Sequence, residues 1–86
     1  MKKINFSKME IFTDISHEHR QVADFRKDFA NIIYRNGSGI EALSLAMKIY
    51  QSEGDTEYDE KECEAIIGYA NMCAPYFVEA IGNQLK

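Results

Sequence analysis

The sequence predicts an α+β fold, with an N-terminal β-hairpin followed by three or four short helices packed around a central apolar helix over residues 38–53. Apolar residues alternate near the N-terminus, as in a strand, and recur with helical spacing after Asp24. The turn signals Asn36-Gly37 and Glu53-Gly54 divide the helical part into segments. With 86 residues, 45% apolar and 28% charged, the chain is expected to form a single small globular domain over residues 1–86.

The first predicted strand covers residues 4–12, and its pattern changes phase halfway. Ile4 and Phe6 share one face, whereas Met9 and Ile11 fall on the other. The change indicates either a β-bulge or a strand that is buried on both faces for part of its length.

The segment after this strand is read as a polar turn over residues 14–19 and a return strand over residues 20–23. The turn lacks the Asn-Gly or Asp-Gly pair that is typical of a tight hairpin. An alternative therefore stays open, in which the first helix begins near Ser16 and absorbs the return strand.

The first helix is expected to begin after Asp24, whose carboxylate can accept an unpaired backbone N–H as an N-cap. Asn36-Gly37 should end this helix, because both residues tolerate the left-handed conformation that closes helices. Its amphipathic stripe consists of Phe25, Phe29, Ile32 and Ile33.

The central helix follows, with Ser38 and Glu41 spaced as a capping box and Gly54 expected just beyond its end. One apolar stripe on this helix consists of Ile40, Leu43, Met47 and Tyr50. Further apolar residues leave little polar surface, so the helix must be surrounded by its own fold or covered by another subunit. The candidate interface consists of Ala42, Leu45, Ala46, Ile49 and Tyr50.

The C-terminal third predicts a short extended segment over residues 55–58 beside the hairpin, and then two helices. Asp59 and Glu62 form a second capping-box pattern at the start of the first of these helices. Pro75 is well placed in the first turn of the last helix. The apolar stripes of the two helices are Cys63, Ile66, Ile67, Ala70 and Cys73, and then Phe77, Ala80, Ile81 and Leu85.

The charge distribution argues against nucleic acid as a partner, since the net charge is −4 and the acidic run 53–64 dominates the second half. Two charge-based alternatives remain. One is a protein that mimics nucleic acid through the acidic run. The other is a small nucleic-acid-binding regulator that uses the N-terminal basic residues Lys2, Lys3, Lys8, Arg20, Arg26 and Lys27.

Candidate metal sites are incomplete in the sequence. The acidic run resembles a calcium loop, but Glu60 stands where the loop needs glycine, and Ile66 where it needs a bidentate glutamate. His17 and His19 alone are fewer than the three or four ligands that zinc requires. We therefore expect no metal.

Catalytic groups and membrane segments are also missing from the sequence pattern. Cys63 and Cys73 lie in an acidic segment, which disfavours a reactive thiolate. On one helix they would lie about 15 Å apart along its axis, too far for a disulfide. We expect reduced cysteines in a cytoplasmic protein that is not an enzyme, binds no cofactor and has no membrane partner.

Five short segments follow one another along the chain: Lys3-Ile4-x-Phe6, Asn31-x-x-Tyr34, Gly39-Ile40, Ala46-x-Lys48-Ile49-Tyr50 and Glu53-Gly54. In these segments and their order, the chain resembles short, functionally uncharacterised proteins encoded in prophages and other mobile elements of gut bacteria. That group favours glycine in the turn where this chain has residues 16–19, and it supplies no catalytic residues. The resulting hypothesis is a non-enzymatic protein–protein interaction or assembly subunit of phage or mobile-element origin, with a second copy of itself as partner.

Overall fold

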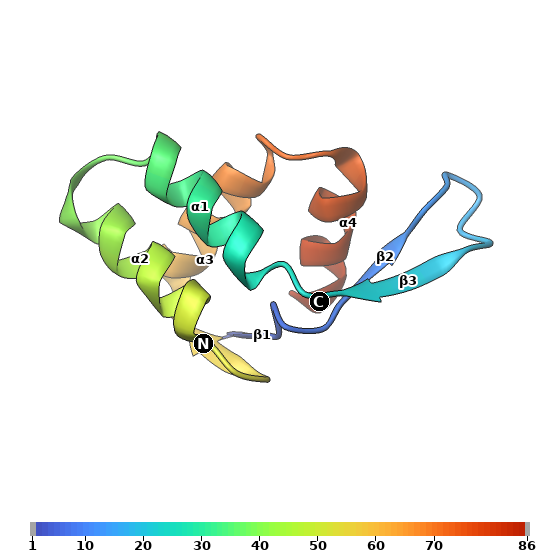
Figure 1. Ribbon diagram of the computed structural model, residues 1–86, viewed down its shortest axis with the longest axis horizontal. Coiled ribbons are helices and arrows are strands. Elements are labelled where there is room, and N and C mark those ends of the chain that lie inside the picture. Colours follow the sequence, from blue (N-terminus) through green and yellow to red (C-terminus); the bar gives the residue numbers. More distant parts are fainter. Residues whose placement is uncertain (1, 86) are drawn as a thin grey trace.

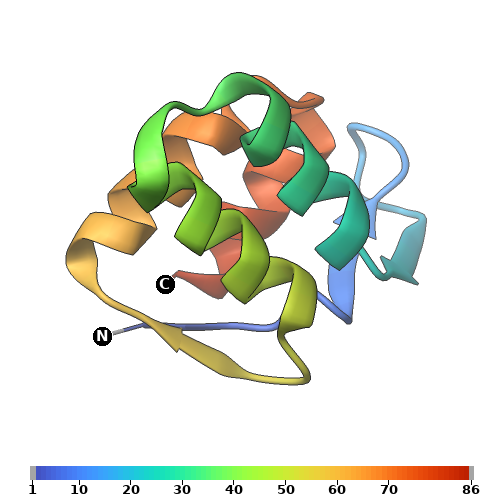
Figure 2. The ribbon, with the colours of Figure 1, turned by 60° about the vertical axis from the view of Figure 1, so that its left-hand side comes forward.

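The computed structural model describes residues 2–85 and confirms the predicted α+β fold (Figure 1). The elements, in chain order, are the strands and helices β1 (Lys2–Ile4), β2 (Met9–Phe12), β3 (Arg20–Ala23), α1 (Arg26–Asn36), α2 (Gly39–Gln51), β4 (Thr56–Tyr58), α3 (Glu60–Ala70) and α4 (Pro75–Gln84). The strands form two separate antiparallel pairs, β1 with β4 and β2 with β3. Seen from the side, the helices lie above the β1–β4 pair and the β2–β3 hairpin projects beyond them (Figure 2).

The single strand predicted over residues 4–12 is wrong, because the chain turns at residues 5–8 and changes sheet. The side-chain oxygen of Asn5 accepts hydrogen bonds from the backbone N–H groups of Ser7 and Lys8, at 3.1 Å each. Such a side-chain bond replaces a backbone one and stabilises a turn. The phase change in the sequence therefore marks the junction between two strands, and no bulge is needed to explain it.

The predicted hairpin with its return strand is confirmed, so the alternative of an early helix is wrong. Ile11 pairs with Gln21 across the hairpin, and the N–H of Thr13 donates to the carbonyl of His19 at 2.9 Å. The extended segment predicted beside the hairpin is β4, but its partner is β1, with Lys3 opposite Glu57.

The start of α1 differs by one residue from the prediction. Phe25 occupies the N-cap position, while the carboxylate of Asp24 accepts the backbone N–H of Arg26 at 3.0 Å and pairs with its guanidinium at 2.8 Å. The side-chain hydrogen bond from Arg26 lowers the pKa of Asp24 most, followed by the backbone bond. The predicted stop at Asn36-Gly37 is confirmed, but Gly37 is extended, at φ −78° and ψ 169°, and not left-handed.

The two predicted capping boxes have opposite outcomes. Asp59 accepts the N–H of Glu62 at 2.8 Å, and the Glu62 carboxylate accepts the N–H of Asp59 at 3.0 Å. Ser38 is the N-cap residue of α2, but its side chain makes no capping hydrogen bond, so the box with Glu41 is wrong. At the other end, Ser52 caps α2, and left-handed Gly54 (φ +63°) lies two residues further on.

Substituting each N-cap residue with alanine should therefore give unequal losses of stability. Asp59→Ala should lower the free energy of unfolding by about 1 kcal/mol, because a reciprocal pair of hydrogen bonds is lost. Ser38→Ala should change it by no more than a few tenths of a kcal/mol, because no side-chain bond is lost. Urea denaturation followed by circular dichroism measures both values. Equal losses would contradict the difference between the two helix starts.

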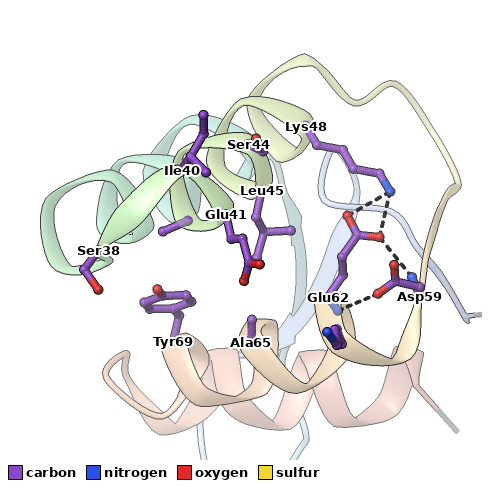
Figure 3. A pocket seen from close by; sticks show the side chains of 12 residues that line it. Ser38, Ile40, Glu41, Ser44, Leu45, Lys48, Asp59, Glu62, Ala65 and Tyr69 are labelled. Atoms are coloured by element: carbon purple, nitrogen blue, oxygen red, sulfur yellow. Dashed lines mark hydrogen bonds and ion pairs between the residues drawn. The ribbon is translucent and has the colours of Figure 1, made fainter.

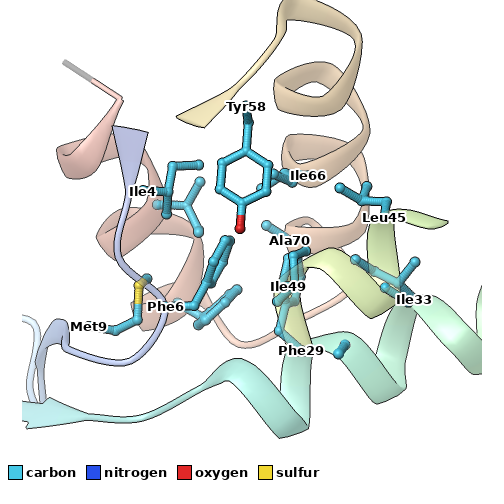
Figure 4. Close-up of a cluster of buried hydrophobic side chains, with 14 of the residues drawn as sticks. Ile4, Phe6, Met9, Phe29, Ile33, Leu45, Ile49, Tyr58, Ile66 and Ala70 are labelled. Carbon is cyan, nitrogen blue, oxygen red and sulfur yellow. The ribbon is translucent and has the colours of Figure 1, made fainter. Parts of the chain in front are cut away.

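The core is centred on three aromatic rings, from the turn after β1, from α1 and from β4 (Figure 4). Phe6 stacks on Phe29 with ring centroids 5.4 Å apart and meets Tyr58 edge-on at 5.9 Å. Burial raises the pKa of Tyr58 to about 12, and its hydroxyl has no hydrogen-bond partner among the described residues. The predicted central helix, α2, instead packs mainly against α1 and lies at one end of the long axis (Figure 1).

Candidate functional site

The candidate interface predicted on α2 is mostly core. The structure buries four of its five residues, Ala42, Leu45, Ala46 and Ile49, against the rest of the chain, and leaves Tyr50 exposed. Small alanine side chains let α1 approach this side of α2 closely, which is why the chain's own fold covers it. The prediction that these four residues form an interface is therefore wrong, because they belong to the core of the chain itself.

The opposite side of α2 is both apolar and exposed. We call it the outer face, and define it as Tyr34 of α1 with Ile40, Leu43, Met47 and Tyr50 of α2. The exposed fraction of these five side chains ranges from 42% to 77%. Together they present roughly 600 Å² of surface, near the upper end of the largest apolar patch on a typical monomer. An exposed patch of this size is typical of an interaction site.

A small notch opens in the outer face where α2 meets α1. Its volume is about 110 Å³. Tyr34, Met47 and Tyr50 are among the residues that line it, together with the small side chains of Ala30 and Ala46. Such a notch can accept one apolar side chain from a partner.

On the other flank of α2, a groove of about 510 Å³ separates this helix from α3 (Figure 3). The ammonium group of Lys48 pairs with both carboxylate oxygens of Glu62, at 3.0 and 3.1 Å, and lies 4.6 Å from the ring centre of Tyr58. Glu62 also belongs to the capping box of α3, so these charged groups join α2 to α3. Glu41 extends from α2 towards the groove, between Tyr69 and Ala65 (Figure 3).

The groove does not assemble a catalytic set from the residues that line it. Nucleophilic catalysis requires a hydroxyl or thiol within hydrogen-bond reach of a base. The hydroxyls of Ser38 and Ser44 make no side-chain hydrogen bond to a base in the described part of the chain.

The histidines and cysteines are spread over separate parts of the fold. His17 pairs with Glu79 of α4 at 2.5 Å and stacks on Phe12, while His19 lies 3.8 Å from Asp14. Over residues 2–85, no group of three or more His, Cys, Asp or Glu side chains is arranged to hold a metal ion. Desolvation raises the pKa of the two thiols, which reduces the thiolate fraction of both cysteines, Cys63 and Cys73.

The N-terminal basic residues do not all offer free positive charge. Arg20 pairs with Glu10 at 2.6 Å across the hairpin. Arg26 pairs with Asp24 and also donates to the carbonyl of Ser52 at 2.8 Å. Both arginines from the predicted basic set are thus engaged by neighbouring groups, which weakens the positive field that a phosphate backbone would require.

Comparison of the chain with protein-family models, with curated proteins and with solved structures gave no match. The resemblance to prophage-encoded proteins stays a prediction. Between residues 2 and 85, none of the helices combines the length and the apolar character that crossing a bilayer requires.

The sequence shows the apolar stripe on the exposed side of α2, but the predicted interface lies mostly on the side that the structure buries. One signal in the sequence distinguishes the two sides. Alanines concentrate on one side of α2, at positions 42 and 46, and the larger Ile40 and Met47 lie on the other. Small side chains favour close helix packing, so the alanine side is the better candidate for the core. Tyr34 had no such signal, because its place beside α2 depends on how the two helices pack.

Proposed function

We propose that this protein is a non-enzymatic assembly subunit that associates with further copies of itself through the outer face. The observation that carries the proposal is the exposure of four large apolar side chains on one side of α2, with Tyr34 beside them. A role in a prophage or other mobile element belongs to the same proposal, and rests on the resemblance of the sequence.

The composition of the outer face supports a protein partner. It contains two tyrosines and a methionine and has no charged residue, and interface cores are enriched in these residue types and depleted in charge. Glu41 and Lys48 lie on the flank, beside the groove to α3. This arrangement matches an apolar centre with a polar rim.

The size of the outer face supports a second copy as the occupant. Two copies that each cover roughly 600 Å² would bury roughly 1,200 Å² in total, at the lower limit of specific, stable interfaces. A two-fold interface uses the same patch twice, so it needs no second apolar surface on the molecule. We therefore expect a dimer that forms in the micromolar range.

Size-exclusion chromatography with light scattering tests the proposal directly. The protein should change from monomer to dimer between low and high micromolar concentration, and Ile40→Asp should keep it monomeric throughout. Ile15→Asp is the matched control. Ile15 is 98% exposed in the hairpin turn, outside the outer face, so the same substitution there should leave the dimer intact. A wild-type protein that stays monomeric at high micromolar concentration refutes self-association.

A further inference from the structure

We infer that two copies pair with their α2 helices antiparallel, and that Ile40 of each copy fills the notch of the other. This inference rests on the proposed self-association and specifies its geometry. It follows from the spacing of the outer stripe, from the dipole of α2 and from the position of the notch.

The outer stripe has the spacing of a coiled-coil seam. Ile40, Leu43, Met47 and Tyr50 are separated by three, four and three residues, which is the alternation of a and d positions in a heptad repeat. Helices with this spacing pack side by side along the seam. In an antiparallel pair the layers match Ile40 with the partner's Tyr50, and Leu43 with the partner's Met47, so every layer joins two different side chains.

The helix dipoles favour the antiparallel direction. Each α2 has a positive N-terminal end and a negative C-terminal end, so an antiparallel pair sets opposite ends side by side, whereas a parallel pair sets like ends side by side. The side chains of Glu41 and Lys48 line the groove to α3, where Lys48 is paired with Glu62. These charges therefore stay outside the seam.

The notch and Ile40 lie at opposite ends of the same stripe. Met47 and Tyr50 line the notch near the C-terminal end of α2, whereas Ile40 projects near the N-terminal end and does not line it. An antiparallel pair therefore brings each Ile40 to the partner's notch, and does so twice by symmetry. The notch volume of about 110 Å³ is of the size of an isoleucine side chain, so the fit needs little rearrangement.

A charge-swap experiment distinguishes the two directions. Leu43→Glu and Met47→Lys should each weaken the homodimer by roughly 100-fold, since each buries two unpaired charges. In the antiparallel geometry, an equimolar mixture of the two variants forms a heterodimer. One of its layers pairs the introduced carboxylate with the introduced ammonium group, while the other three layers keep wild-type residues. The mixture should therefore dimerise within about tenfold of the wild type by analytical ultracentrifugation.

The outcomes of this experiment distinguish the antiparallel geometry from self-association as such. Recovery of the dimer in the mixture supports the antiparallel pair. A dimeric wild type with a monomeric mixture overturns the antiparallel geometry but leaves self-association standing, because in a parallel pair the introduced carboxylate would face the partner's Leu43. Two dimeric single variants, or a monomeric wild type, overturn the proposed function as well. Both substituted positions are exposed, so circular dichroism of each variant should show a folded protein.

Ile40→Ala tests the assignment of Ile40 to the notch. This variant should dimerise roughly 100-fold more weakly than the wild type, because the contact between residue 40 and the partner's notch is lost twice per dimer. Val22→Ala, on the exposed side of β3, is the control and should leave the affinity unchanged. An unchanged affinity for Ile40→Ala would overturn the assignment of Ile40 to the notch.

Discussion

Phe6→Ala should lower the free energy of unfolding by about 3–5 kcal/mol, enough to unfold a large part of the protein at room temperature. Phe6 is fully buried and contacts the rings of both Phe29 and Tyr58. Its loss would leave a cavity at the point where the turn after β1, the helix α1 and the strand β4 meet. The carbonyl of Phe6 also accepts the N–H of Phe25 at 2.8 Å, a bond that alanine can keep, so the loss reports on the side chain.

Urea denaturation measures this loss, with Phe12→Ala as the matched control. Phe12 is half-buried on the hairpin and stacks on His17 with ring centroids 4.2 Å apart. Its substitution removes less buried surface and should cost about 1 kcal/mol. Similar losses for Phe6→Ala and Phe12→Ala would contradict the placement of Phe6 at the centre of the core.

The N-terminal segment shows how far local patterns lead. The sequence revealed a change of phase between Phe6 and Met9, and the structure has a junction between two strands at that place. The partner of β1 is β4, more than fifty residues further along the chain. Strand pairing over such a separation depends on how the helices bring the segments together, and a local period carries no information about it.

The α2 helix shows a second limit of prediction from local sequence patterns. Both of its stripes are apolar, so the hydrophobic pattern predicts a helix without choosing the side that faces the core. The choice depends on the fit of side chains against α1, where Ala42 and Ala46 are buried. Of the five residues predicted as an interface, the structure therefore leaves Tyr50 exposed and buries the other four in the core.

The capping boxes show a third limit, because the same motif has different outcomes at Ser38 and Asp59. Gly39, the first residue of α2, is left-handed at φ +79°. This conformation turns the chain as it enters the helix, so the Ser38 hydroxyl does not reach the N–H groups of the first turn. A sequence motif supplies the hydrogen-bonding groups, and the backbone path decides whether they meet.

Gly37→Ala should lower the free energy of unfolding by about 2–3 kcal/mol, because the added methyl group has no space. A Cβ atom at this position would lie 2.6 Å from the Cβ of Ala42, 2.7 Å from the hydroxyl of Tyr69 and 2.8 Å from the carbonyl oxygen of Ile33. The Ile33 carbonyl is fixed by its hydrogen bond from the N–H of Gly37, at 2.7 Å. The connection between α1 and α2 must therefore shift.

The same substitution separates two explanations for this glycine. The sequence suggested a left-handed conformation, yet the observed φ of −78° is one that alanine adopts without strain. If conformational freedom alone explained the glycine, alanine would be neutral or would stabilise the fold by reducing the entropy of the unfolded chain. If crowding by α2 and by Tyr69 of α3 explains the glycine, alanine should instead destabilise the fold.

Gly68→Ala and Gly82→Ala are the matched controls for Gly37→Ala. Both glycines lie inside helices, and a Cβ at either position meets no atom within 4 Å. Alanine should therefore stabilise these helices by about 0.5–1 kcal/mol each, through its higher helix propensity. Thermal and urea denaturation of the three variants should thus give one loss and two gains. An increase in stability at all three positions would show that α1, α2 and α3 are not packed tightly around Gly37. The alignment of Tyr34 on α1 with Tyr50 on α2 at the notch would then be contradicted as well, because it depends on the same packing.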